Sequence, residues 1–116
     1  SAFINDINER GLSEKILLVI TGEFGRTPKI NNKGGRDHWG NLCPLVFVGG
    51  GLKMGQVIGE SDKKGSEPIT NPITSNDLLG TIMHSLFDLG KVRTLANLPR
   101  DVQDAVSSGN PIRELV

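Results

Sequence analysis

The 116-residue chain is poor in aromatic residues, contains one cysteine and carries no net charge. A single cysteine, Cys43, excludes a disulfide within the chain. Thirteen basic residues balance thirteen acidic ones, and no basic stripe with interleaved aromatic residues is present, so nucleic acid is not expected as a partner. No apolar run reaches the length of about 18 residues that a membrane span needs, and we find no signal-peptide pattern. We therefore expect no membrane segment, and the compartment stays open because a parent protein could be exported.

Two apolar runs, Ile16–Ile20 and Leu45–Val48, predict strands. Neither run alternates with polar residues, which is typical of strands that are covered on both faces in an α/β sheet. Cys43 lies at the edge of the second run and is predicted to be a small buried hydrophobic residue.

Hydrophobic spacing and end signals predict three helices, at residues 3–10, from Thr74 to near Gly90, and at 98–107. Gly11 is placed to end the first helix, and Thr74 with Asp77 forms a capping pattern for the second. The segments 56–61 and 67–71 flank a turn-forming sequence and predict a short hairpin.

A Gly-rich loop of more than 20 residues separates the two predicted strands, and it holds Glu23, Arg26, Arg36, Asp37 and His38. Long loops without periodicity are usually functional or disordered. A carboxylate and an imidazole are suitable ligands for a divalent cation. Glu23 follows the first strand and His38 precedes the second, so the two residues reach the same edge of the sheet only if the strands run antiparallel. We predict that they do.

Ordinary structural roles compete with this interpretation. Glu23 could pair with Arg26, and Arg36 with Asp37 could form a solvated pair of little energetic weight. His38 could anchor the loop through a hydrogen bond to the backbone. His84 is predicted to be a half-exposed helix residue rather than a ligand.

Five segments carry a resemblance to an uncharacterised bacterial sulfatase-like family, a domain of unknown function. They are GEFGRTPKIN (22–31), GGRDHW (34–39), GGGLKMGQVIGESD (49–62), SNDLLGTIMHSL (75–86) and GNPIREL (109–115). The family in turn is similar to the alkaline phosphatase superfamily, in which an apolar strand ends in Ser/Thr-x-Asp-His-Gly. The corresponding stretch here is 21–25, where Glu23 stands for the metal-binding Asp but Phe24 replaces the His. His38 matches a metal-binding His six residues before a strand-opening Pro, here Pro44.

The resemblance implies metal ligation by Glu23 and His38, with Zn, Ca or Mn as the cofactor of a full-length protein, and binding of a small anionic ester by Arg26 and Arg36. It also implies that the nucleophile lies in a missing amino-terminal half, so no catalytic residue is expected here. The expected fold is a three-layer α/β fold with a small mixed sheet and flanking helices. It would be an incomplete alkaline-phosphatase-like domain with residues 1–116 as its carboxy-terminal portion.

Two functions follow from the resemblance. The first is a segment of a metal-dependent sulfate- or phosphate-ester hydrolase that is inactive alone. The alternative is a non-catalytic binding or structural module that kept the fold and lost the metal site, as Phe24 suggests. Buried-type strands in a partial domain would also expose apolar surface, and we expect self-association in that case.

Overall fold

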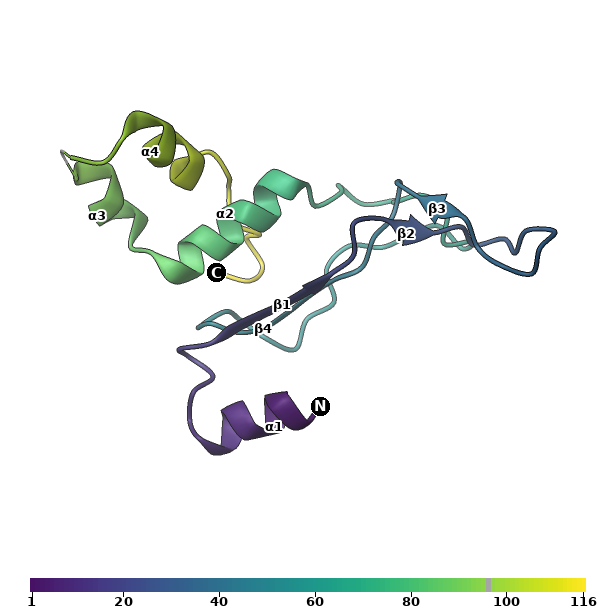
Figure 1. Ribbon diagram of the computed structural model, residues 1–116, viewed down its shortest axis with the longest axis horizontal. Helices are drawn as coiled ribbons and strands as arrows, with labels where there is room; N and C mark the ends of the chain where they lie inside the picture. Colours follow the sequence, from purple (N-terminus) through teal and green to yellow (C-terminus); the bar gives the residue numbers. More distant parts are fainter. Residues whose placement is uncertain (96) are drawn as a thin grey trace. The chain divides into compact units, whose positions relative to one another are not determined.

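The computed structural model describes residues 1–95 and 97–116 as helices with two small two-stranded sheets (Figure 1). This confirms the expected α/β class. The chain divides into two compact units. The first unit comprises Ser1–Leu18, Val48–Gln56 and Ile73–Val116, and the second comprises Val19–Phe47 and Val57–Pro72.

Helix α1 (Ala2–Glu9) ends as its sequence predicts. The backbone N–H of Gly11 donates to Asn8 and that of Leu12 to Ile7, at 3.1 and 2.9 Å, which is the hydrogen-bond pattern of a Schellman motif. Gly11 has a φ of 64° there, a conformation that glycine adopts without strain. Ile7 is the residue through which this helix is buried.

Helix α2 (Ser75–Leu86) begins with the predicted capping box. The Asp77 carboxylate accepts hydrogen bonds from the Thr74 hydroxyl and backbone N–H at 2.6 and 2.8 Å, while the Thr74 hydroxyl accepts one from the Asp77 N–H. The bonds from the Thr74 side chain and then its backbone lower the pKa of Asp77 below its usual value. The reciprocal bonds fix where this helix starts.

The buried face of α2 consists of Gly80 and Thr81. Gly80 packs against the backbone of Gly109 and Asn110 so closely that a Cβ there would approach Gly109 to 2.6 Å. The Thr81 side chain is fully buried and bonds in two directions, donating to the Asp77 carbonyl at 2.7 Å and accepting from the Ile112 N–H at 2.9 Å. The carboxy-terminal segment is therefore held on α2 through small residues and one hydroxyl.

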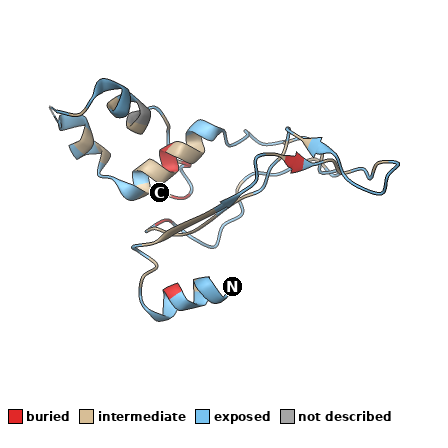
Figure 2. Ribbon diagram, viewed as in Figure 1, coloured by how far each residue is buried: buried red, intermediate tan, exposed pale blue. Residues whose placement is uncertain are grey.

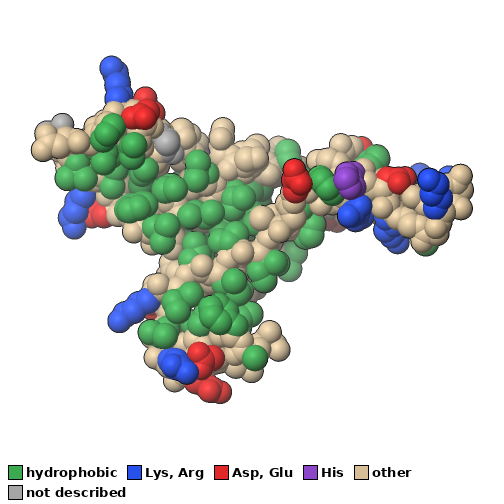
Figure 3. Space-filling model, viewed as in Figure 1, with side chains coloured by type: hydrophobic (Ala, Val, Ile, Leu, Met, Phe, Trp, Pro, Cys, Tyr) green, Lys and Arg blue, Asp and Glu red, His purple; other side chains and the backbone are tan. Residues whose placement is uncertain are grey.

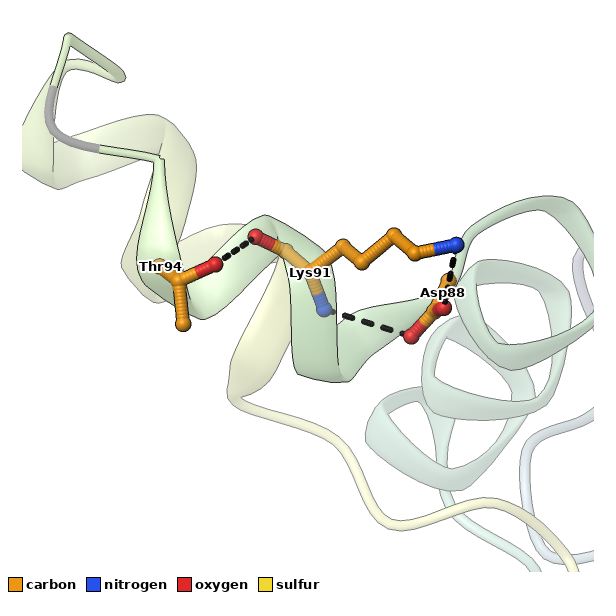
Figure 4. Close-up of polar contacts among 3 residues, drawn as sticks. All are labelled: Asp88, Lys91 and Thr94. Atoms are coloured by element: carbon orange, nitrogen blue, oxygen red, sulfur yellow. Dashed lines mark hydrogen bonds and ion pairs between the residues drawn. The ribbon is translucent and has the colours of Figure 1, made fainter.

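Two short helices follow, α3 (Leu89–Thr94) and α4 (Arg100–Ser107). Helix α4 lies within the predicted range 98–107. Helix α2 was predicted to continue to near Gly90, but it ends at Leu86 and α3 begins shortly after it. The difference arises because the Asp88 carboxylate accepts from the Lys91 N–H at 3.2 Å and so caps a new helix (Figure 4). Lys91 also pairs with Asp88 through its ammonium group, and its carbonyl accepts from Thr94. None of the described helices is both long and apolar enough to cross a lipid bilayer.

Strands β1 (Leu17–Thr21) and β4 (Leu45–Gly49) pair in one sheet. In the first unit, the Gly50 N–H, just after β4, donates to the Ser13 carbonyl, ahead of β1, at 2.7 Å. In the second unit, the Cys43 sulfur, ahead of β4, lies 3.3 Å from the carbonyl oxygen of Gly22, just after β1. The beginning of each strand thus neighbours the end of the other, and the predicted antiparallel direction is confirmed.

Burial in this pair differs from the expectation. No residue of β1 or β4 is buried, and Ile20 and Val46 are 52% and 45% exposed, so the prediction of strands covered on both faces is wrong. The prediction that Cys43 is buried is also wrong, because its side chain is exposed beside the carbonyl oxygens of Gly22 and Pro44. An apolar run reports the propensity to form a strand but not whether other elements cover it.

Few hydrophobic residues of the described chain are buried, and Figure 2 shows that most of the ribbon is exposed or half-buried. The buried ones are Ile7, Leu52, Ile112 and Leu115. Large hydrophobic side chains lie open at the surface, including those over α1 and over the α3–α4 pair (Figure 3). We expected exposed apolar surface from a partial domain, and both the partial domain and its self-association stay predictions.

The second unit is built around two short strands, β2 (Gly25–Arg26) and β3 (His38–Trp39). They pair antiparallel, with Gly25 opposite Trp39 and Arg26 opposite His38. The predicted hairpin forms a turn closed by a single bridge between Ser61 and Pro68 rather than by two regular strands.

Replacing Thr81 by Val tests the attachment of the carboxy-terminal segment. Valine keeps the shape but leaves the buried Ile112 N–H without its acceptor, so we expect a loss of about 1–3 kcal/mol in the free energy of unfolding, measured by urea denaturation. Thr81→Ser keeps the hydroxyl and removes one methyl group, which costs about 0.8 kcal/mol. A Val variant as stable as the Ser variant would contradict this account.

Candidate functional site

The β2–β3 pairing gathers three side chains on one face of the two-stranded ribbon. Phe24 and His38 stack with ring centroids 3.8 Å apart and an interplanar angle of 27°. The Arg26 guanidinium lies over the Phe24 ring at 5.5 Å from its centroid, within the range of a cation–π contact. Since Arg26 is directly opposite His38 in the register, the three side chains form one cluster. We call it the exposed trio after the exposed Arg26 and His38, while Phe24 is half-buried.

The opposite face of the ribbon is packed. Gly25 is buried, and a Cβ at this position would fall on the carbonyl oxygen of Leu42. The half-buried Trp39 donates its indole N–H to the Ser66 carbonyl at 2.7 Å. Because successive strand residues point to opposite faces, a packed Gly25 and Trp39 leave Arg26 and His38 facing outward.

Glu23 precedes this cluster and its side chain is exposed. Within the described part of the chain, neither Glu23 nor His38 makes a side-chain hydrogen bond or an ion pair. The two alternative roles, a Glu23–Arg26 pair and a backbone anchor for His38, are therefore not found there. Figure 3 shows a histidine with charged side chains of both signs over the β2–β3 region. The carboxylate oxygens and the imidazole nitrogens are available to a ligand. His84 is exposed on α2.

Arg36 and Asp37 hold the loop rather than pairing with each other. The Arg36 Nη1 donates to the carbonyls of Thr27 and Pro28 at 2.8 and 2.6 Å. The Asp37 carboxylate accepts from the Asn31 amide at 2.9 Å, and its backbone bonds Thr27 in both directions. These contacts rigidify the segment between β2 and β3. Arg26 donates one long bond of 3.4 Å to the Arg36 carbonyl, which leaves most of its N–H groups free.

A shallow depression of about 450 Å³ lies in the same loop. It is open to solvent and lined by Thr27, Lys29, Ile30, Asn31, Asn32 and Asp37. Two of these residues, Thr27 and Asp37, directly follow Arg26 and precede His38 in the sequence. The depression therefore borders the exposed trio without including it.

Sequence reasoning missed the contacts that dock the 60–70 hairpin. Besides the bond from Trp39, the Asn41 amide donates to the Glu67 carboxylate at 2.6 Å. Asp62 closes the hairpin by accepting from the Ser66 N–H and hydroxyl at 2.6 and 2.8 Å. These bonds, the backbone one first, lower the pKa of Asp62. The chain offers one signal for them, namely turn-forming residues immediately after Asp62.

The described residues do not complete a metal site. A catalytic zinc ion generally takes three protein ligands, and a structural one takes four. In the part of the chain that the structure describes, no three His, Cys, Asp or Glu side chains lie close enough to hold a metal ion. Glu23 and His38 would offer two donors at most, so a metal would need further ligands from elsewhere.

Comparison with known proteins assigns the chain to a family. A family model described as "Protein of unknown function (DUF1501)" matches residues 1–116, which is the whole chain. No curated protein and no solved structure matches the chain.

Gly25→Ala tests the packed face of the ribbon. We expect a loss of roughly 1–3 kcal/mol in the stability of the second unit, because the added methyl group must displace the Leu42 backbone. Trp39 is the sole tryptophan and the chain has no tyrosine, so its fluorescence reports unfolding of this unit. Gly40→Ala is the matched control: nothing lies within 4 Å of its Cβ, and a change below about 0.5 kcal/mol is expected. Equal effects at both positions would refute the steric argument.

Acid is expected to release the hairpin through Asp62. The folded-state pKa of Asp62 lies below its ordinary value of 3.8, so its contribution to stability is complete above that value and is lost as the pH falls through the folded-state pKa. Trp39 emission should stay constant from neutral pH to about pH 4 and shift to the red at lower pH. Asp62→Ala, which removes every acceptor oxygen of this side chain, should be red-shifted already at neutral pH. An identical acid transition in the Ala variant would assign the change to other groups.

Proposed function

The chain belongs to the DUF1501 family of proteins of unknown function, and we propose that it is a segment of a metal-dependent sulfate- or phosphate-ester hydrolase. In this proposal the segment is inactive alone and contributes binding groups to an active site whose nucleophile lies elsewhere in the protein. The resemblance to sulfatase-like and alkaline-phosphatase-like proteins, in which Glu23 and His38 match metal-binding positions, supplies the reaction class. The observation that carries the proposal is the exposed trio, together with the free carboxylate of Glu23.

Arg26 is the group best suited to bind the ester. Its guanidinium is exposed, and the Phe24 ring orients it. A sulfate or phosphate group presents several oxygens, which a guanidinium can bind through paired, charge-assisted hydrogen bonds. Arg36 is the second predicted anion-binding residue. Its bonds to the Thr27 and Pro28 carbonyls favour a supporting role for it in holding the loop.

The position of Phe24 is compatible with ligation by His38. A metal binds imidazole through a nitrogen lone pair in the plane of the ring, whereas a stacked phenyl ring covers the face of the imidazole. Phe24 therefore fixes the orientation of His38 without occupying its donor atoms. His38 and Glu23 would together supply two ligands to Zn, Ca or Mn, and such a cation would polarise an ester oxygen as a Lewis acid.

The test is hydrolysis of aryl sulfates and aryl phosphates by the full-length protein, before and after treatment with a chelator. We expect kcat/KM to fall about 100-fold or more in Glu23→Gln, His38→Ala and Arg26→Gln, because each variant removes a charged or ligating group from the reacting centre. Lys33→Gln removes one positive charge from the same loop and should leave the rate unchanged. Activity that survives all three substitutions would remove these residues from the mechanism.

The alternative function is a binding or structural module without chemistry. The specific feature in its favour is Phe24, which occupies the position of a metal-binding His in the sulfatase-like pattern. Metal content separates the two functions. Stoichiometric Zn, Ca or Mn in the full-length protein supports the hydrolase, whereas failure to take up these ions on reconstitution supports the module.

A further inference from the structure

Strand β3 is too short to hold His38 by pairing alone. It comprises two residues and pairs with the two residues of β2. Isolated two-stranded ribbons are marginally stable at best, even when they are longer. Some other contact must therefore fix the plane of β3 and the direction of the residues on its outer face.

The 60–70 hairpin makes that contact. Trp39 and Asn41 lie two residues apart and bond consecutive residues of the hairpin, Ser66 and Glu67, at 2.7 and 2.6 Å. Both bonds join segments 26 or 27 residues apart in the sequence. Trp39 lies on the face of the ribbon opposite to His38, so the hairpin holds β3 from behind while leaving the exposed trio open.

Asp62 fixes the acceptors themselves. It receives hydrogen bonds from the N–H and hydroxyl of Ser66 and a longer one of 3.3 Å from the N–H of Glu67. Its own N–H donates to the Glu67 carbonyl at 2.9 Å. Hydrogen bonds thus connect Asp62 to Trp39 through Ser66, and to Asn41 through Glu67. Trp39 and Asn41 both follow His38 closely in the sequence.

We propose that Trp39, Asn41 and Asp62 are positioning residues that hold the His38 imidazole in its stack on Phe24. The inference rests on the proposed function for its catalytic meaning, since it makes the hairpin the element that orients a ligand of the reaction centre. In this proposal they act without contacting the substrate. They act by fixing β3, as supporting residues do when they orient a ligating histidine.

The experiment measures the stack directly, by proton NMR of the full-length protein. Ring current from Phe24 displaces the signals of the His38 ring protons, and Phe24→Leu gives the position of the unstacked signal. We expect Trp39→Phe, which keeps an aromatic ring but loses the N–H donor, to lose most of this displacement. Asn41→Leu and Asp62→Ala should do the same.

Glu67 provides the conservative pair. Glu67→Gln keeps a carbonyl oxygen that accepts from Asn41 and should retain the displacement, whereas Glu67→Leu should lose it. Ser85→Ala serves as a control in the first unit, where it removes a long-range hydrogen bond of 2.7 Å to the Gly50 carbonyl. This variant should leave the His38 signals unchanged, which separates positioning from a general loss of stability.

Full displacement in both Trp39→Phe and Asn41→Leu would overturn the proposal, as would equal behaviour of the Gln and Leu variants at position 67. Hydrolysis of an aryl sulfate by the same samples gives a separate result. If the displacement is lost in the variants and the unaltered protein hydrolyses no ester, the positioning contacts stand and the proposed function fails. If ester hydrolysis is present and its kcat falls with the displacement, both stand.

Discussion

The register between β2 and β3 is the constraint on which the candidate site depends. Pairing Arg26 with His38 sends these two side chains to one face and leaves Gly25 and Trp39 on the other. Only glycine fits at position 25, because the Leu42 carbonyl occupies the space of a side chain. A shift of one residue would reverse every orientation and would turn the charged face inward. Two residue pairs thus determine which groups a ligand can meet.

The second unit stabilises this register through polar contacts more than through a core. Arg36 ties the intervening loop to its own backbone, and the Asn31 amide donates to the Asp37 carboxylate across the same loop. The hairpin closed by Asp62 holds β3 from the packed side. Each bond contributes little by itself at an exposed position, so the arrangement depends on several of them acting together. Such a loop is pre-organised, which lowers the entropy lost when a ligand binds.

Features encoded by neighbouring residues were predictable from the sequence. The carboxyl end of α1 follows from Gly11, and the start of α2 follows from the Thr74–Asp77 pair. The direction of β1 against β4 was predicted on different grounds, by asking how Glu23 and His38 could share an edge. The contacts of Trp39 and Arg36 were not predictable, because their partners are backbone carbonyls that any sequence supplies. The exposure of Cys43 was missed for a related reason, since cover by other elements is a property of the whole fold.

A ligand site on the exposed trio requires that His38 is held beside Phe24 and Arg26. A nuclear Overhauser measurement on the ring protons tests it most directly. The 3.8 Å separation of the two ring centroids predicts strong cross-peaks between Phe24 and His38. Absence of those cross-peaks, with the His38 ring signals at the values of a free histidine, would contradict the arrangement on which the site is built.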